Sequence, residues 1–327
     1  MLLRPVILIH DLGGSPDDWD RWGVVSRLVN EGGLDPRLIR RFEYGYVRHG
    51  TVPRYDAQGD LIQIAHRLSD AAAVPEGEAF QVDALAAESR ALGGPDKVSL
   101  VALGAGGILA RYYLSRRTPD ALGTRYNGNV DKVILVGTPN RGARLESVAG
   151  DWERRMGWLR LFMPARAKDA MKRAFAAFDA LRDRVLAEMP GESGPPISPR
   201  ALGLLQISEK SFLLRYLNRP ECTPRDVRFW CLAGQITVQF RIPTRTACVP
   251  VEVHVGDLLT MPHSATAVPG ARPVLTVFRN GYCVDVTRPA TDDPLAWFGG
   301  DLPPYAHTRL MQQMEVQRAI LDILTHN

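Results

Sequence analysis

Short apolar runs alternate with segments of helical periodicity through the first 140 residues of the chain. Three of the runs consist mainly of Val, Leu and Ile, which predicts buried β-strands at residues 6–9, 98–103 and 130–136. Apolar residues at helical spacing predict helices near residues 19–30, 60–68, 80–92 and 108–115. Strands that are apolar along their whole length and separated by helices are typical of a parallel sheet covered on both faces. The sequence therefore predicts an α/β fold.

The pattern changes in the middle of the chain. Residues 170–189 predict an amphipathic helix, which follows a stretch rich in Trp and Arg. The segment 190–199 is rich in Pro, Gly and Ser, which is typical of a linker. We therefore expect an inserted helical cap or lid at residues 143–200, between a first core part at 1–142 and a second core part at 201–327.

The second core part continues the sheet. Apolar runs predict strands at residues 227–232 and 273–278, and helical spacing predicts a last helix from His307 to Leu324. The interleaved Arg and Trp of the insertion would suit either a packed cap or contact with an anionic lipid surface, and we favour the cap.

Composition narrows the class of protein. The chain has 327 residues, of which 45% are hydrophobic and 23% are charged, as in ordinary globular proteins. A net charge of +4 gives no reason to expect a nucleic-acid partner. The four cysteines form no CxxC pair, so neither a zinc site nor a thioredoxin-type site has support. No compact spacing of His and Asp calls for another metal, and we expect no cofactor. The first apolar run is too short for the core of a signal peptide, so we expect either a cytoplasmic protein or a chain that has already been processed, and we favour the first.

The stretch 98–114 predicts a strand, a tight Gly-rich turn and a helix, and two kinds of site have this form. A dinucleotide-binding turn needs GxGxxG, but Leu109 stands at the third glycine, and no acidic residue ends a second strand at the required distance. A nucleophile elbow needs G-x-S-x-G, in which a strained turn presents a side chain above the sheet. In that alignment Ala102 replaces the first glycine and Gly104 stands where the nucleophilic serine belongs. We favour the elbow.

Other segments support this interpretation in chain order. They are VILIHDLGGS at 6–15, GTPNRG at 137–142, GDLLTMPHSA at 256–265, and His307 at the start of the last helix. Together with the elbow they resemble the lipase and esterase branch of the α/β-hydrolase family, over most of the chain outside the insertion. Two positions depart from the family pattern: Asp11 replaces a glycine of the usual HGLGGS, and Gly104 replaces the serine.

The resemblance implies an α/β-hydrolase fold and hydrolysis of a carboxylic ester by a Ser-Asp-His triad. On that basis Gly104 is the nucleophile position, Asp257 is the triad acid and His307 is the base. The backbone N–H groups of Leu12 and Ala105 would form the oxyanion hole. A small ester or a lipid-like molecule is the expected substrate.

The residues themselves leave some roles open. His254 and His263 are rival bases, although chain order favours His307. His10 is expected to form structural hydrogen bonds. Asp11 would bond either the backbone of its own loop or a polar group of the substrate, and the sequence does not choose between them.

Gly104 supplies no hydroxyl group, so we expect little turnover of esters, and whether the chain is an enzyme stays undecided. Three explanations are open: an engineered substitution, a natural binding protein that keeps the fold, or direct activation of water by His307. Acyl transfer on the same fold is a further alternative. Gly104→Ser is expected to produce esterase activity that His307→Ala abolishes.

Overall fold

The computed structural model describes residues 2–42, 44, 46–49, 52–55, 60–66, 82–115, 126–145, 163–189, 197–198, 201–243, 247–285 and 298–326. Most of the predicted linker and the Trp- and Arg-rich stretch before residue 163 lie outside these ranges. The described part contains no helix that is both long and apolar enough to cross a membrane.

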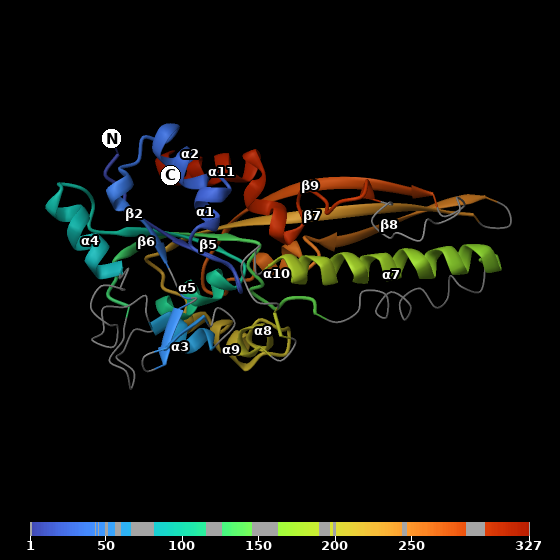
Figure 1. Cartoon of the computed structure of the whole chain (residues 1–327), viewed down its shortest axis with the longest axis horizontal. Helices are drawn as coiled ribbons and strands as arrows, with labels where there is room; N and C mark the ends of the chain where they lie inside the picture. The colour runs from blue at the N-terminus through green and yellow to red at the C-terminus, as the bar shows by residue number, and fades with distance from the viewer. Residues whose placement is uncertain are drawn as a thin grey trace.

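A seven-stranded, mostly parallel sheet forms the centre of the molecule (Figure 1). Its order is β2-β1-β5-β6-β7, and both β8 and β9 pair with β7. All pairings are parallel except that of β7 with β8. The strands are β1 (Val6–Ile9), β2 (Ile39–Phe42), β5 (Val98–Leu103), β6 (Val130–Val136), β7 (Arg228–Pro243), β8 (Cys248–Gly256) and β9 (Val274–Asp285). A separate hairpin contains β3 (Tyr46–His49) and β4 (Val52–Tyr55).

Successive side chains of a strand point to opposite faces of the sheet, so a strand that is apolar along its whole length places apolar side chains on both faces. In β1, Val6 and Leu8 join one hydrophobic cluster, whereas Ile7 and Ile9 join the other. This is why the predicted strands contain no polar alternation. Strands β1, β5 and β6 have the bounds that the sequence predicts. The predicted α/β fold is confirmed.

Helices cover the two faces. On one face lie α1 (Asp18–Arg21), α2 (Val24–Asn30) and α11 (Met314–His326). On the other lie α3 (Leu61–His66), α4 (Val82–Ala91), α5 (Ala105–Ser115), α8 (Leu202–Gln206) and α9 (Phe212–Leu217). The single helix predicted over 19–30 is therefore two helices. The predicted last helix begins with the 3₁₀ segment η5 (His307–Gln312) before α11. Shorter segments are η1 (Pro36–Leu38), η3 (Pro220–Cys222) and α10 (Pro262–Ala265).

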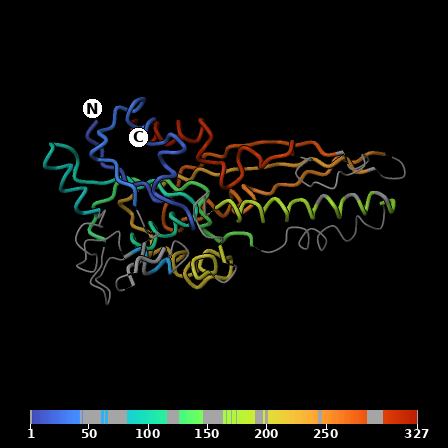
Figure 2. Tube along the Cα trace, viewed as in Figure 1, coloured from blue at the N-terminus to red at the C-terminus, as the bar shows by residue number. Residues whose placement is uncertain are grey.

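The second half of the sheet projects as an arm, which the sequence did not predict (Figures 1 and 2). β7 pairs with β6 only as far as Leu232 and then continues beside β8 and β9. From Ile236 onwards, every second residue of β7 is apolar and buried, and the residues between them are mostly polar. The buried residues are Ile236, Val238, Phe240 and Ile242. The six-residue strands predicted at 227–232 and 273–278 are thus the first parts of β7 and β9. The remainder was not predicted because half-buried strands alternate apolar and polar residues and so form no apolar run.

The long helix α7 (Ala165–Glu188) lies along this arm (Figure 1). Its apolar face packs against β7: the rings of Phe175 and Phe178 lie 5.9 and 6.0 Å from the ring of Phe240. The helix predicted over 170–189 is therefore present and begins five residues earlier, at Ala165.

We predict that Phe178→Ala lowers the free energy of unfolding by about 3–5 kcal/mol, the usual cost of removing a buried aromatic ring. Phe178 is 1% exposed and contacts the rings of Phe240 and Phe298. Urea unfolding measures the change. Lys172→Ala, at an exposed position of the same helix, is the control and should shift it by less than about 0.5 kcal/mol. Equal effects of the two substitutions would contradict the packing of α7 on the arm.

Candidate active site

The candidate site lies at the carboxyl ends of the parallel strands, where loops from several strands meet. β1 leads into Asp11, and β5 leads directly into Gly104. β8 ends at Gly256 and leads into Asp257, and His307 begins η5. The structure brings all four residues together, although they come from distant parts of the chain.

Gly104 has the backbone of a nucleophile elbow. Its φ is +52°, in the left-handed region that favours glycine, and α5 begins at the next residue. Its N–H donates to the carbonyl oxygen of Val136 at 2.9 Å, which ties the turn to β6. A strained turn between a strand and a helix is the geometry that presents a nucleophile above the sheet.

The space above Gly104 is filled by the side chain of Asp11. A Cβ atom built on Gly104 would lie 2.1 Å from Oδ1 of Asp11, 2.3 Å from its Cγ and 2.5 Å from its Oδ2. The carboxylate therefore occupies the volume in which a serine side chain would begin. Glycine at position 104 is what allows this close approach.

The two backbone donors expected for the oxyanion hole converge on this carboxylate. The N–H groups of Leu12 and Ala105 each donate to Oδ1 of Asp11 at 2.7 Å. The other oxygen, Oδ2, accepts from Nε2 of His307 at 2.8 Å. Asp11 thus bonds both its own loop and the turn after β5.

A second carboxylate holds the other side of the imidazole. Oδ2 of Asp257 lies 2.8 Å from Nδ1 of His307, and the N–H of His307 donates to the carbonyl oxygen of Asp257 at 2.9 Å. Oδ1 of Asp257 accepts from the N–H groups of Leu259 and Thr260 at 3.0 and 2.6 Å. Leu258, which lies between Asp257 and these two donors, adopts a φ of +79°, and this lets the loop fold back onto the carboxylate. The two backbone donors therefore fix the orientation in which the Asp257 carboxylate faces His307.

The surrounding charges make His307 a cation. Burial by itself lowers the pKa of this imidazole, but the negative charges of Asp257 and Asp11 outweigh burial and raise its pKa to about 10. Both ring nitrogens face carboxylate oxygens, which accept hydrogen bonds and cannot donate them when ionised. An imidazolium with a proton on each nitrogen satisfies both contacts, and a neutral imidazole satisfies only one.

A glycine at the end of β6 leaves room for this arrangement. Gly137 has a φ of +56°, and a Cβ atom there would lie 3.0 Å from Oδ2 of Asp257 and 3.2 Å from Cε1 of His307. A larger residue would press on the ion pair. This position belongs to the GTPNRG segment, so the resemblance pointed to it without giving its role.

The other histidines considered from sequence lie apart from Asp257. His254 is exposed and lies 3.0 Å from Oγ1 of Thr237, and His263 is exposed in α10. His10 is buried and stacks on the ring of Tyr44, with 3.9 Å between centroids. Burial lowers the pKa of His10 to about 4, so it is neutral, and its Nδ1 bonds the carbonyl oxygen of Asp11 at 2.8 Å.

A cleft of about 720 Å³ opens beside Asp11 and His307. Its other lining residues come from α1 and the loop before it, from the end of β5, from the end of α7 and from η5. They are Gly14, Asp18, Arg21, Trp22, Leu103, Ala187, Glu188, Met189, Thr308, Arg309 and Gln312. Charged side chains therefore make up much of the wall of this cleft. Within the described residues, no group of His, Cys, Asp and Glu is arranged to hold a metal ion.

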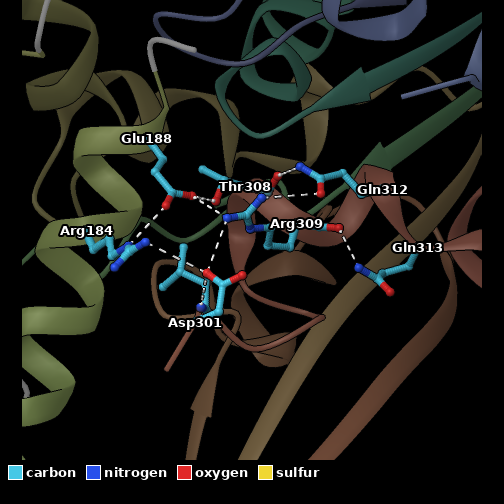
Figure 3. Close-up of polar contacts among 8 residues, drawn as sticks. Arg184, Glu188, Asp301, Thr308, Arg309, Gln312 and Gln313 are labelled. Carbon is cyan, nitrogen blue, oxygen red and sulfur yellow. Dashed lines mark hydrogen bonds and ion pairs between the residues drawn. The ribbon is translucent and has the colours of Figure 1, made fainter. Parts of the chain in front are cut away.

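An ion network fastens the end of α7 to the segment that carries His307 (Figure 3). Nη2 of Arg309 lies 3.4 Å from both Oε2 of Glu188 and Oδ1 of Asp301. The hydroxyl of Thr308 donates to Glu188 at 3.4 Å, and Nε of Arg184 lies 3.2 Å from its other oxygen. The end of α7 is thus held as one wall of the cleft.

Sequence reasoning noticed Asp11 but did not place it at the centre of the site. The missing signal was the pairing of two departures, an extra carboxylate at position 11 and a lost side chain at position 104. These residues lie at the ends of neighbouring parallel strands, β1 and β5, so one can fill the space that the other leaves. The mostly parallel seven-stranded sheet with helices on both faces fits the α/β-hydrolase fold that the sequence predicts.

No protein-family model and no curated protein matches the sequence. Among solved structures, phospholipase PlaB from Legionella pneumophila is 12% identical with a TM-score of 0.41, and the match covers 98% of this chain and 63% of that one. A thermostable carboxyl esterase from Bacillus coagulans is 14% identical with a TM-score of 0.42, over 86% of this chain and 83% of that one. EstA from Clostridium botulinum is 12% identical with a TM-score of 0.42, and the match covers 98% of this chain and 87% of that one. Identities this low leave the chemistry of this chain to be argued from its own site.

We predict that His307 stays protonated on both nitrogens well above pH 7 and that Asp11→Asn lowers its pKa, because the substitution removes one of the two negative charges. Nitrogen NMR of imidazole-labelled protein measures both titrations. An imidazole that titrates near 6.5 in the unchanged protein would contradict the double ion pair.

The same cation makes stability depend on pH. The pKa of His307 rises from 6.5 to about 10 on folding. Its contribution to the free energy of unfolding is therefore fully present below pH 6.5 and is lost as the pH rises towards about 10. We therefore expect the unchanged protein to lose more unfolding free energy across this interval than His307→Gln does. Urea unfolding at stepped pH values makes the comparison, and parallel losses in the two proteins would count against the prediction.

Proposed function

We propose that this chain is a lipase- or esterase-type hydrolase scaffold that does not hydrolyse carboxylic esters through a serine. The observation that carries the proposal is the Asp11 carboxylate, which fills the space above Gly104. In this view Gly104, Asp257 and His307 stand at the positions of a triad. Leu12 and Ala105 supply the oxyanion donors.

Three requirements of acyl transfer are unmet. Gly104 has no hydroxyl group to attack a carbonyl carbon. The donors that would stabilise a substrate oxyanion are already bonded to Oδ1 of Asp11. His307 carries a proton at neutral pH, because its pKa is raised to about 10, and so does not act as a general base there. The same contacts disfavour direct activation of water by His307.

Binding of a small molecule is the alternative role of the scaffold. The cleft beside Asp11 and His307 supports it, and an ester or a lipid-like compound is the class that the resemblance suggests. The segment 143–200 would act as a cap through α7, whose end forms one wall of the cleft. Two charged residues of the cleft, Glu188 at the end of α7 and Arg309 in η5, favour a ligand with a polar part.

The sequence alone led us to expect esterase activity from Gly104→Ser, and the position of Asp11 changes that expectation. We now predict that Gly104→Ser alone produces little activity and that Asp11→Gly combined with Gly104→Ser produces an esterase. A Cβ atom at position 104 meets Oδ1 of Asp11 at 2.1 Å, so the serine needs the carboxylate removed. Removing it also frees the N–H groups of Leu12 and Ala105 for a substrate oxygen. Release of p-nitrophenol from short- and medium-chain esters should rise at least about 10²-fold over the single variant, within the usual range of acid–base contributions.

The matched control is the double variant that also carries His307→Ala, which should lose the gain. Esters hydrolysed by the unchanged chain would overturn the proposal that Asp11 and Gly104 prevent acyl transfer. A folded double variant that hydrolyses no ester of any length would show that the scaffold lacks an acyl site and would favour the binding role.

A further inference from the structure

We propose that a second cleft, at the amino ends of β7 and β9, binds a small molecule that joins a phosphate group to an apolar or aromatic body. This cleft has a volume of about 300 Å³ and lies where the two strands begin. The candidate active site lies at the opposite, carboxyl ends of the parallel strands. The inference therefore goes beyond the proposed function and does not depend on it.

Three arginines and no acidic residue line the second cleft. They are Arg225 and Arg228, in the loop before β7 and at its start, and Arg272, in the loop before β9. The side chains of Arg225 and Arg272 form no hydrogen bond or ion pair within the described part of the chain. The neighbouring carboxylate of Asp226 accepts a hydrogen bond from the hydroxyl of Tyr126 at 3.3 Å and does not line the cleft. The residues of the lining thus leave its positive charge unbalanced.

Two further cations lie near Arg228. Nζ of Lys132 lies 5.9 Å from the centre of the Trp230 ring, and Cζ of Arg228 lies 5.4 Å from it. Burial, and then the positive charges of Arg4 and Arg228, lower the pKa of Lys132 to about 8. The carboxylate of Asp131 opposes this shift without cancelling it. Nη1 of Arg4 is buried and has no hydrogen-bond partner among the described residues. The surplus of positive charge at this end of the sheet favours an anion there.

The remaining lining of the second cleft is mostly apolar and includes Val227, Trp230 and Val274. Trp230 is 7% exposed, and its indole N–H has no hydrogen-bond acceptor in the described ranges. Val274 is 55% exposed, so apolar surface lies open beside the arginines. A ligand with an apolar or aromatic body would bury this surface, whereas a bare phosphate ion would not.

A close contact between two loops fixes the shape of the cleft. Gly270 has a φ of +85°, and a Cβ atom there would lie 2.6 Å from the carbonyl oxygen of Pro220. Glycine therefore lets the loop before β9 lie against η3, which precedes the loop that carries Arg225. Arg225 and Arg272 thus belong to loops that are held against each other, and an anion between them requires little rearrangement.

A phosphate monoester fits these groups better than a carboxylate. Each guanidinium can donate two parallel hydrogen bonds to a phosphate or a carboxylate. A phosphate monoester carries about 1.5 to 2 negative charges at pH 7 and three terminal oxygens, so it can bond two arginines at once. The volume of the cleft is at the lower end of the range of about 300–1,000 Å³ for small-molecule sites, which suits a compact ligand.

Calorimetric titration of the full chain with phenyl phosphate, inorganic phosphate and phenol tests the inference. We expect phenyl phosphate to bind at least about 10-fold more tightly than either of the others, because only the whole molecule meets both the arginines and the apolar lining. Arg225→Gln and Arg272→Gln should each weaken its binding about 10-fold or more, the usual effect of losing a hydrogen bond to a charged group. Arg279→Gln removes the same charge from an exposed position of β9 outside the cleft, and this control should leave binding unchanged.

NMR of the six indole N–H groups of the unchanged protein locates the ligand without any dependence on a binding variant that fails to fold. The signal of Trp230, assigned with Trp230→Phe, should shift most when phenyl phosphate is added. A larger shift of Trp22, which lines the cleft beside His307, would place the ligand in the candidate active site and overturn the inference. Absence of binding, or equal weakening by Arg279→Gln, would overturn it too.

The phosphate monoester could belong to a soluble compound or to a lipid headgroup, and cosedimentation with vesicles distinguishes these sources. The vesicles contain phosphatidylcholine with or without phosphatidic acid. Once phenyl phosphate is shown to bind, sedimentation that requires phosphatidic acid and is reduced by Arg272→Gln would assign the phosphate to a lipid. Its absence would assign the phosphate to a soluble compound. Both results support the inference and leave the proposed function to the ester assays.

Discussion

One cation between two carboxylates organises the candidate site. His307 bonds Asp11 through Nε2 and Asp257 through Nδ1, each at 2.8 Å. The remaining oxygen of each carboxylate is held by two backbone N–H groups. Three buried charges are therefore compensated by each other and by the main chain, which is the condition under which charges are stable away from water. Removing His307 would leave both buried carboxylates without their cation, whereas removing either carboxylate would leave a single ion pair.

The fold supplies this arrangement by bringing strand ends together. Parallel strands place the residues after β1 and β5 side by side, and β8 returns towards the same edge to deliver Asp257. The arm of β7, β8 and β9 begins where β6 ends, so the site lies at its base (Figure 1). α7 extends along the arm, and its last turn reaches the cleft. This helix thus contributes one wall of the cleft, which includes the charged Glu188.

Much of the core could be predicted from the sequence, and the reasons are physical. The strands at 6–9, 98–103 and 130–136 are buried on both faces, so their apolar runs gave correct bounds. The arm was missed because its strands alternate in polarity and β8 carries exposed residues at most of its positions before Val253. The meeting of Asp11 and Gly104 could not be derived from local patterns, since it depends on two loops that are 93 residues apart and adjacent only in the folded sheet.

The position of the Asp11 carboxylate and the protons on His307 are the central claim, and neutron diffraction of crystals grown near neutral pH tests it most directly. The account predicts a deuterium on both Nδ1 and Nε2 of His307, with Oδ1 of Asp11 on the N–H groups of Leu12 and Ala105. A single deuterium on the ring, or a water molecule in place of Oδ1 with Asp11 turned away, would contradict it.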